Sequence, residues 1–314
     1  MYEIEGKKIW IPGANGLVGS ALVRRLQNEN CTLLSTLRAE IDLMDQHQVS
    51  LWLEQQRPDI IILAAAKVGG ILANESLPVD FLYHNLMIQN NVIALAHKWN
   101  VKKLLFLASS CAYPRLCAQP MREDMLLSGD FEPTNQWYGL AKMAGIKLCQ
   151  AYQKQYGCHF ISAIPTNLYG PNDNFHIEHS HVPAGLLYRF HRAKIEKQDE
   201  VLLWGSGQVK REFLYVDDMA DACVFLLRHY NEHTPINIGT GSDISIVDFA
   251  NLVKKTVGCR SKLVHDHSKK DGAPQKRLDV SKINALGWSA QTTLEEGLSL
   301  YYRWFCEHLK EIRQ

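Results

Sequence analysis

The sequence has no excess of either charge. Its 314 residues include 34 lysines and arginines and 33 aspartates and glutamates, which gives a formal net charge of +1 at pH 7. A chain without an overall positive field does not attract nucleic acid or anionic lipid through its net charge. We therefore expect no nucleic-acid partner, and any anionic ligand has to be held by local donors.

Long hydrophobic runs are also missing. The longest, residues 60–66, ends at Lys67 and falls far short of the ~20 residues that cross a bilayer. The N-terminal segment carries Glu3 and Glu5, whereas a secretory signal begins with basic residues. We therefore expect a cytoplasmic protein that does not associate with a membrane.

Cysteine is too sparse for a disulfide scaffold. The eight cysteines include no C-x-x-C pair, and this absence also argues against a zinc site beside the three histidines at 176, 179 and 181. We expect free thiols, most of them small buried side chains, and no bound metal. Cys111 alone lies in a context that suggests chemistry, two residues after the end of a predicted strand.

What the sequence does contain is 46% hydrophobic residues in an alternating pattern. Five short apolar runs predict strands at Lys8–Pro12, Thr32–Leu37, Asp59–Ala66, Lys103–Ser109 and His159–Pro165. Between them, helical spacing predicts helices at Leu17–Gln27, Gln46–Gln56, Val79–Trp99 and Trp137–Tyr156. Strands that alternate with helices form a parallel sheet covered on both faces, so we predict a doubly wound α/β fold.

Beyond Pro165 the pattern becomes irregular. After a loop over residues 169–181, it predicts helices at Val182–Ala193, Asp217–Tyr230 and Ser245–Thr256, and strands at Glu200–Trp204, Arg211–Val216 and Pro235–Gly239. Thr292 and Glu295 predict a capping box for a last helix through Phe305. We expect a first domain of residues 1–165, to which part of 211–240 returns, and a smaller substrate-binding lobe within 166–314.

A glycine-rich turn follows the first predicted strand. Gly13, Gly16 and Gly19 have G-x-x-G-x-x-G spacing and lead into the first helix, as in a dinucleotide-binding Rossmann domain. Arg38, after the second strand, is suited to the 2′-phosphate of NADP because guanidinium pairs with phosphate oxygens. Glu40 is a competing signal for NAD.

Tyr138 and Lys142 lie four residues apart, so a helix places both on one face with about 6 Å of rise between them. A nearby cation favours phenolate, so we expect the pKa of Tyr138 to be lowered from about 10. Ser109 ends a predicted strand, and the carboxyl ends of parallel strands line the cofactor crevice.

These features resemble the extended short-chain dehydrogenase/reductase family over nearly the whole chain, including its Ser, Tyr and Lys catalytic set. Within that family the chain is similar to the branch that acts on GDP-4-keto-6-deoxy sugars. The blocks that carry this resemblance are Ala64–Ile71, Ser109–Pro114, Pro165–Pro171, Asp173–His176, Ser180–Val182, Trp204–Gly207 and Arg211–Leu214.

The resemblance implies a reaction in two stages. GDP-4-keto-6-deoxy-D-mannose is epimerised at C3 and C5 and is then reduced at C4 with NADPH. The C4 ketone acidifies both neighbouring C–H bonds, so each inversion needs a base on one face and an acid on the other. The resemblance gives these roles to Cys111 and His181, and it assigns the reduction to Ser109, Tyr138 and Lys142. Without it, Cys111 reads as a buried thiol and His181 as part of a surface loop.

The resemblance also implies the binding residues. For NADP(H) they are Gly13, Asn15, Gly16, Leu17, Val18, Gly19, Arg38, Asp42, Leu43, Ala65, Lys142, Pro165, Asn167, Leu168 and His181. For the GDP-sugar they are Arg189, Trp204, Arg211 and Asp271. One departure is that relatives often carry a basic pair where this chain has Ala14 and Asn15, so the expectation of NADP depends mainly on Arg38.

Two other functions stay open at this point. A sister enzyme acting on another GDP-keto-sugar, of the colitose or deoxyheptose type, would keep the same catalytic set. A dinucleotide-sensing protein without activity would need none of Ser109, Cys111, Tyr138, Lys142 and His181. The resemblance further implies a homodimer formed through the helices Val79–Trp99 and Trp137–Tyr156.

Overall fold

The computed structural model describes residues 1–176, 179–268 and 271–312. Its centre is a six-stranded sheet in the order β10-β5-β4-β3-β1-β2, and every neighbouring pair is parallel. The strands are β1 (Lys8–Pro12), β2 (Thr32–Thr36), β3 (Ile60–Leu63), β4 (Lys103–Leu107), β5 (His159–Pro165) and β10 (Ile236–Ile238). The prediction of a doubly wound α/β fold is confirmed.

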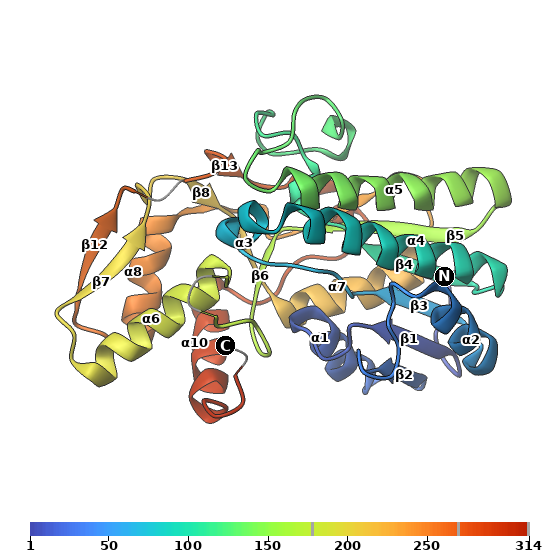
Figure 1. Ribbon diagram of the computed structural model, residues 1–314, viewed down its shortest axis with the longest axis horizontal. Helices are drawn as coiled ribbons and strands as arrows, with labels where there is room; N and C mark the ends of the chain where they lie inside the picture. Colours follow the sequence, from blue (N-terminus) through green and yellow to red (C-terminus); the bar gives the residue numbers. More distant parts are fainter. Residues whose placement is uncertain (177–178, 269–270, 313–314) are drawn as a thin grey trace.

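Helices cover both faces of this sheet (Figure 1). On one face, α1 (Leu17–Leu26) packs against α7 (Val216–His229). On the other, α4 (Asn85–Lys98) packs against α2 (Gln46–Gln56) and α5 (Gln136–Tyr156). The two cores are separate because side chains alternate along a strand. Ile9 and Ile11 join the first core, whereas Trp10 joins the second.

A smaller lobe adjoins the carboxyl ends of the strands (Figure 1). Three helices, α6 (Val182–Glu196), α8 (Ile246–Val257) and α10 (Leu294–Glu307), surround a third core that contains Phe190 and Phe249. Its strands are short. They are β6 (Asn167–Tyr169), β7 (Glu200–Trp204), β8 (Lys210–Arg211), β9 (Phe213–Tyr215), β11 (Ile244–Ser245), β12 (Lys262–Asp266) and β13 (Gln275–Lys276).

Several elements differ from the sequence-based predictions. The helix predicted at 79–99 divides into a π-helical turn, η1 (Asp80–His84), and α4. The predicted strand at 211–216 becomes β8 and β9, separated by Glu212. Part of the predicted loop 169–181 lies outside the described residues, namely 177–178. Sequence analysis did not anticipate α3 (Ile71–Ser76), α9 (Ser281–Ala285), the 3₁₀ turns η2 (Ser110–Ala112) and η3 (Glu123–Met125), and the strands β6, β11, β12 and β13.

The predicted capping box was wrong by one residue. Thr293 caps α10 by accepting from the Glu296 N–H, and the Glu296 carboxylate accepts from the Thr293 N–H in return. Thr292 instead donates its hydroxyl to Asp218 at 2.9 Å, which joins the start of α10 to α7. The sequence spacing fits both pairs, and this long-range contact decides between them. No helix among the described residues is both long and apolar enough to span a membrane.

Candidate active site

A cavity of about 970 Å³ lies between the central sheet and the smaller lobe. It opens at the carboxyl ends of β1, β3, β4 and β5. In doubly wound sheets, ligands bind at this edge, at the point where the strand order reverses. Every residue that sequence analysis assigned to catalysis, cofactor or substrate lines this cavity. The fold therefore brings residues from position 13 to position 271 to one site.

The glycine turn forms a close contact between β1 and β3. Gly13 has φ +88°, and a Cβ atom there would lie 2.8 Å from the Ala65 backbone nitrogen. A Cβ atom on Gly19 would lie 2.0 Å from the Gly13 oxygen. Gly16 precedes α1 and contributes no side-chain cap. Because the first N–H groups of a helix attract anions, this turn is built to receive a pyrophosphate.

Arg38 and Glu40 differ in what their side chains contact. Arg38 is exposed and lines the cavity, together with Asp42 and Leu43. The Glu40 carboxylate accepts a hydrogen bond of 2.7 Å from the Leu37 N–H, within its own turn. Of the two competing signals, Arg38 lines the cavity and Glu40 does not.

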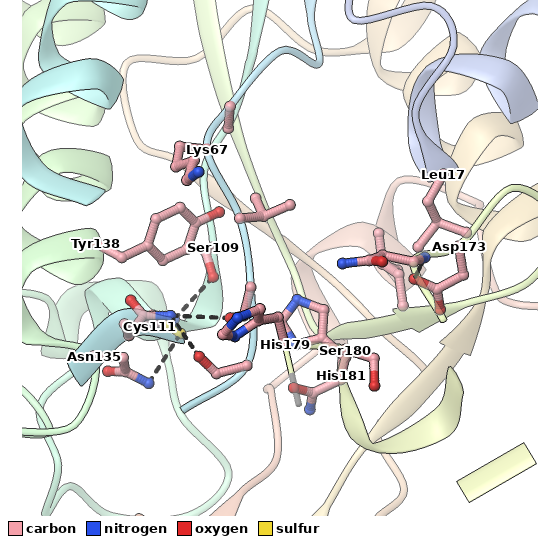
Figure 2. Close-up of a pocket in the computed structure, with 18 of the residues that line it drawn as sticks. Leu17, Lys67, Ser109, Cys111, Asn135, Tyr138, Asp173, His179, Ser180 and His181 are labelled. Carbon is pink, nitrogen blue, oxygen red and sulfur yellow. Dashed lines mark hydrogen bonds between the residues drawn. The ribbon is translucent and has the colours of Figure 1, made fainter. Parts of the chain in front are cut away.

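Ser109, Tyr138 and Lys142 are tied to the end of β4. Lys142 is buried, and its Nζ donates to the Leu107 carbonyl oxygen at 2.8 Å. The Ser109 hydroxyl hydrogen-bonds the phenol of Tyr138 and accepts from the Cys111 N–H at 3.2 Å. Figure 2 shows Ser109, Cys111 and Tyr138 grouped in this part of the cavity.

The charges of this group differ from expectation. Burial and the nearby Cys111 raise the pKa of Tyr138, and the hydrogen bond from Ser109 only partly offsets them. Burial also lowers the pKa of Lys142 to about 7, so its ammonium is only partly charged at neutral pH. The expectation that Lys142 lowers the pKa of Tyr138 is therefore wrong for this structure, because desolvation of the phenol dominates and Ser109, not Lys142, provides the opposing effect.

Cys111 lies at the centre of a polar contact set. Its Sγ accepts from Asn135 Nδ2 at 3.4 Å and from Lys276 Nζ at 3.8 Å. Lys276 is buried, and Arg211 is close enough to Cys111 for an electrostatic interaction between the two side chains. These donors can compensate negative charge that develops on the sulfur when it gives up its proton.

His181 enters the cavity from the other lobe. It is the residue before α6, and a backbone hydrogen bond of 2.9 Å from Gly70 to the His179 carbonyl holds the preceding loop. A Cβ atom on Gly70 would lie 2.7 Å from the Ser180 oxygen, so the two loops are in direct backbone contact. The His181 side chain is exposed to the cavity, but the protein around it excludes bulk water, and this desolvation lowers the pKa of His181. Figure 2 shows the His179–His181 segment beside the Cys111 group.

The residues assigned to the GDP-sugar form the far part of the cavity. Arg189 lies over the Trp204 ring, 5.1 Å from its centre, and burial lowers the pKa of Arg189 to about 10. Arg211 donates to the Asp271 carbonyl oxygen at 3.3 Å. The Asp271 carboxylate accepts from the Ser206 N–H at 2.8 Å. This arrangement offers two cations and an aromatic face to a ligand.

Sequence analysis missed Asn135 and Lys276. Asn135 is the N-cap of α5 and lies two residues before the predicted helix Trp137–Tyr156, so the helical spacing did not point to it. Lys276 is 165 residues from Cys111 and belongs to a two-residue strand, so local sequence held no signal for it. Among the described residues, no group of three or more His, Cys, Asp or Glu side chains is placed to hold a metal ion.

Comparisons with known proteins agree with this geometry. The NAD dependent epimerase/dehydratase family matches residues 9–239. The chain is 49% identical to a GDP-L-fucose synthase of Sinorhizobium fredii over 99% of both chains. The structure is similar to a GDP-6-OMe-4-keto-L-xylo-heptose reductase from C. jejuni (TM-score 0.93, 34% identity, 98% and 99% coverage). It is also similar to a GDP-L-fucose synthetase from Naegleria fowleri bound to NADP (TM-score 0.92, 27% identity, 100% and 98% coverage).

Proposed function

Because the chain belongs to the NAD dependent epimerase/dehydratase family, we propose that it converts GDP-4-keto-6-deoxy-D-mannose to GDP-L-fucose with NADPH. The observation that carries this proposal is the combination of side chains lining one cavity. A reductase needs only Ser109, Tyr138 and Lys142. The additional thiol of Cys111 and imidazole of His181 supply the acid–base pair that an epimerase needs.

Epimerisation begins with proton removal beside the C4 ketone. The Cys111 thiolate takes the proton from carbon, and Asn135 and Lys276 stabilise the charge on its sulfur before the transfer. His181 returns a proton to the opposite face of the sugar ring. Its lowered pKa makes the imidazolium a stronger acid and also less populated at neutral pH, so His181 takes up a proton from solvent before the transfer. The same pair acts at C3 and at C5 as the ring is repositioned. Between the two inversions Cys111 releases its proton to solvent and His181 takes one up.

Reduction then requires a proton donor beside the C4 oxygen. NADPH, when bound, supplies hydride to C4. Tyr138 delivers its phenolic proton to the oxygen, and Ser109 donates a hydrogen bond to the same atom. The raised pKa of Tyr138 keeps the phenol protonated at neutral pH, as a proton donor must be. Lys142, fixed on the Leu107 carbonyl, orients the nicotinamide ribose.

The residues of the glycine turn fit a dinucleotide. The close approaches at Gly13 and Gly19 leave no space for side chains, and the N-terminus of α1 faces the cavity. Arg38 would hold the 2′-phosphate, which is the basis for proposing NADPH. The Naegleria relative bound to NADP supports the same choice.

The deciding experiment mixes the protein, NADPH and GDP-4-keto-6-deoxy-D-mannose in deuterated water. We expect consumption of NADPH and deuterium at both C3 and C5 of the product. The similarity to the C. jejuni heptose reductase supports a second candidate, a reductase acting on a GDP-keto-heptose. Turnover of that heptose and none of the 6-deoxy sugar would replace the first proposal with the second.

We also propose a homodimer in the cytoplasm. Apolar side chains are exposed on the outer side of η1 and α5, including Val79 (69%), Tyr83 (51%) and Leu140 (43%). A second copy of the chain would cover them, with α4 and α5 of both copies packed together. All eight cysteines are unpaired, which suits a reducing compartment. Light scattering that gives the mass of one chain at micromolar concentration would contradict the dimer.

A further inference from the structure

Glu212 is a carboxylate with no solvent exposure, between β8 and β9. Its Oε1 accepts backbone hydrogen bonds from Thr240 (2.6 Å) and Gly241 (2.8 Å), and its Oε2 accepts one from Leu278 (2.7 Å). A Cβ atom on Gly239 would lie 2.2 Å from Oε1, so glycine is required where the carboxylate enters. Burial of an acid is costly, and a side chain this completely coordinated has a specific task.

Glu212 also contacts the segment that contains Lys276. Its N–H donates to the Lys276 carbonyl at 3.3 Å, while its carboxylate holds the N–H of Leu278 two residues further on. Glu212 therefore binds both Lys276 and the residue two positions after it. Strand β13 has only two residues, so its ladder with β8, to which this N–H bond belongs, is short, and the Glu212 carboxylate extends the contact to Leu278.

On the cofactor side, the Glu212 carbonyl oxygen accepts from Asn167 Nδ2 at 2.8 Å and from Thr166 Oγ1 at 3.1 Å. Asn167 lines the cavity, and its amide is oriented by this bond. The neighbouring residue Arg211 lines the cavity as well. A single buried residue thus connects the ends of β5, β10 and β13.

We propose that Glu212 is a positioning residue whose carboxylate holds the Lys276 ammonium against the Cys111 thiol. The importance of this for catalysis rests on the proposed function, because it assumes that Cys111 transfers protons. The contact itself is 3.8 Å between Lys276 Nζ and Cys111 Sγ. The 275–278 segment is also held at Arg277, by Gln119 and Met121. Loss of the carboxylate would remove the anchor at Leu278, and the ammonium would shift away from the sulfur.

The test measures how fast iodoacetamide alkylates Cys111 in the full chain, by mass spectrometry of the peptide that contains this residue. Only the thiolate reacts, and the nearby ammonium stabilises it. We expect Glu212→Gln to slow alkylation at pH 7.5 about fivefold to tenfold, because the amide presents a donor to backbone N–H groups. If Glu212→Gln does not fold, Glu212→Asp retains the charge but is shorter, and about a threefold slowing is expected.

Two controls separate positioning from general damage. Glu123→Gln alters another partly buried carboxyl, which accepts from the Asn237 N–H at 2.9 Å, and it should leave alkylation unchanged. Lys276→Gln should slow alkylation as much as Glu212→Gln does, and the double variant should be no slower than either. An unchanged rate in Glu212→Gln, an equal loss in Glu123→Gln, or additive losses in the double variant would overturn the proposal. Since no sugar is added, the result is independent of whether the proposed reaction occurs.

Discussion

Lys142 Nζ lies 5.7 Å from the centre of the Tyr138 ring, and it donates its hydrogen bond to the Leu107 carbonyl at the end of β4. The lysine thereby connects α5 to the strand that leads to Ser109. Because these side chains are held in place, a substitution at one of them removes a defined chemical group. Its effect on epimerisation and on reduction can therefore be predicted separately.

The first prediction concerns Tyr138→Phe. Removing the phenol removes the proton donor for the C4 oxygen, so NADPH oxidation should fall by roughly 10²- to 10⁴-fold. Deuterium should still enter C3 and C5, because Cys111 and His181 are unchanged. Tyr152→Phe, on the same helix α5, is the control and should retain both activities. Loss of isotope incorporation in Tyr138→Phe would show that the phenol takes part in epimerisation.

Cys111→Ser and His181→Ala should have the opposite pattern. Each removes one member of the acid–base pair, so we expect incorporation of solvent deuterium at C3 and C5 to fall at least ~10²-fold. The affinity for NADPH, measured by fluorescence titration, should change little. Cys117→Ser alters a second partly buried thiol six residues further on and should incorporate deuterium normally. Normal incorporation in both active-site variants would refute the assigned roles.

Cofactor preference is a prediction about Arg38. Replacing it with alanine removes charge-assisted hydrogen bonds to a 2′-phosphate, each worth about 1.5–3 kcal/mol. The KM for NADPH should therefore rise roughly tenfold to hundredfold, whereas the KM for NADH should stay nearly constant. Arg260→Ala, at an exposed position after α8, serves as the control. Equal effects on both cofactors would mean that Arg38 does not contact the 2′-phosphate.

The sequence predicted the central sheet well because its strands are buried on both faces. Runs such as Lys8–Pro12 and His159–Pro165 coincide with β1 and β5, since continuous hydrophobicity is a local property. The two-residue strands β11 and β13 were missed, because they exist only through pairing with distant segments. The same reason explains Thr292, whose bond to Asp218 lies beyond any local pattern.

For the candidate site, sequence and fold contributed different information. The glycine turn and the Tyr138–Lys142 spacing could be recognised as motifs in the sequence, and the resemblance supplied roles for Cys111 and His181. The sequence did not predict the pKa shifts of Tyr138 and Lys142, because desolvation depends on the whole surrounding structure. The sequence also did not predict the cation beside Cys111, because Lys276 comes close to Cys111 only in the folded chain.

The last prediction concerns Lys103, the first residue of β4, at the opposite end of the sheet from the cavity. The side chain is 2% exposed, its Nζ donates to the Tyr230 carbonyl at 2.7 Å, and burial lowers its pKa from 10.5 to about 8. Between these two pH values the unfolded chain binds more protons than the folded one, so this lysine makes the free energy of unfolding rise with pH.

Replacing Lys103 with methionine should remove that pH dependence. In urea unfolding at pH 7.5, 8.5 and 9.5, the wild type should gain stability relative to Lys103→Met by up to about 1 kcal/mol per pH unit. Lys102→Met, at the exposed neighbouring position, should remain parallel to the wild type. A constant difference between wild type and Lys103→Met across the three pH values would mean that Lys103 keeps its proton in the folded protein.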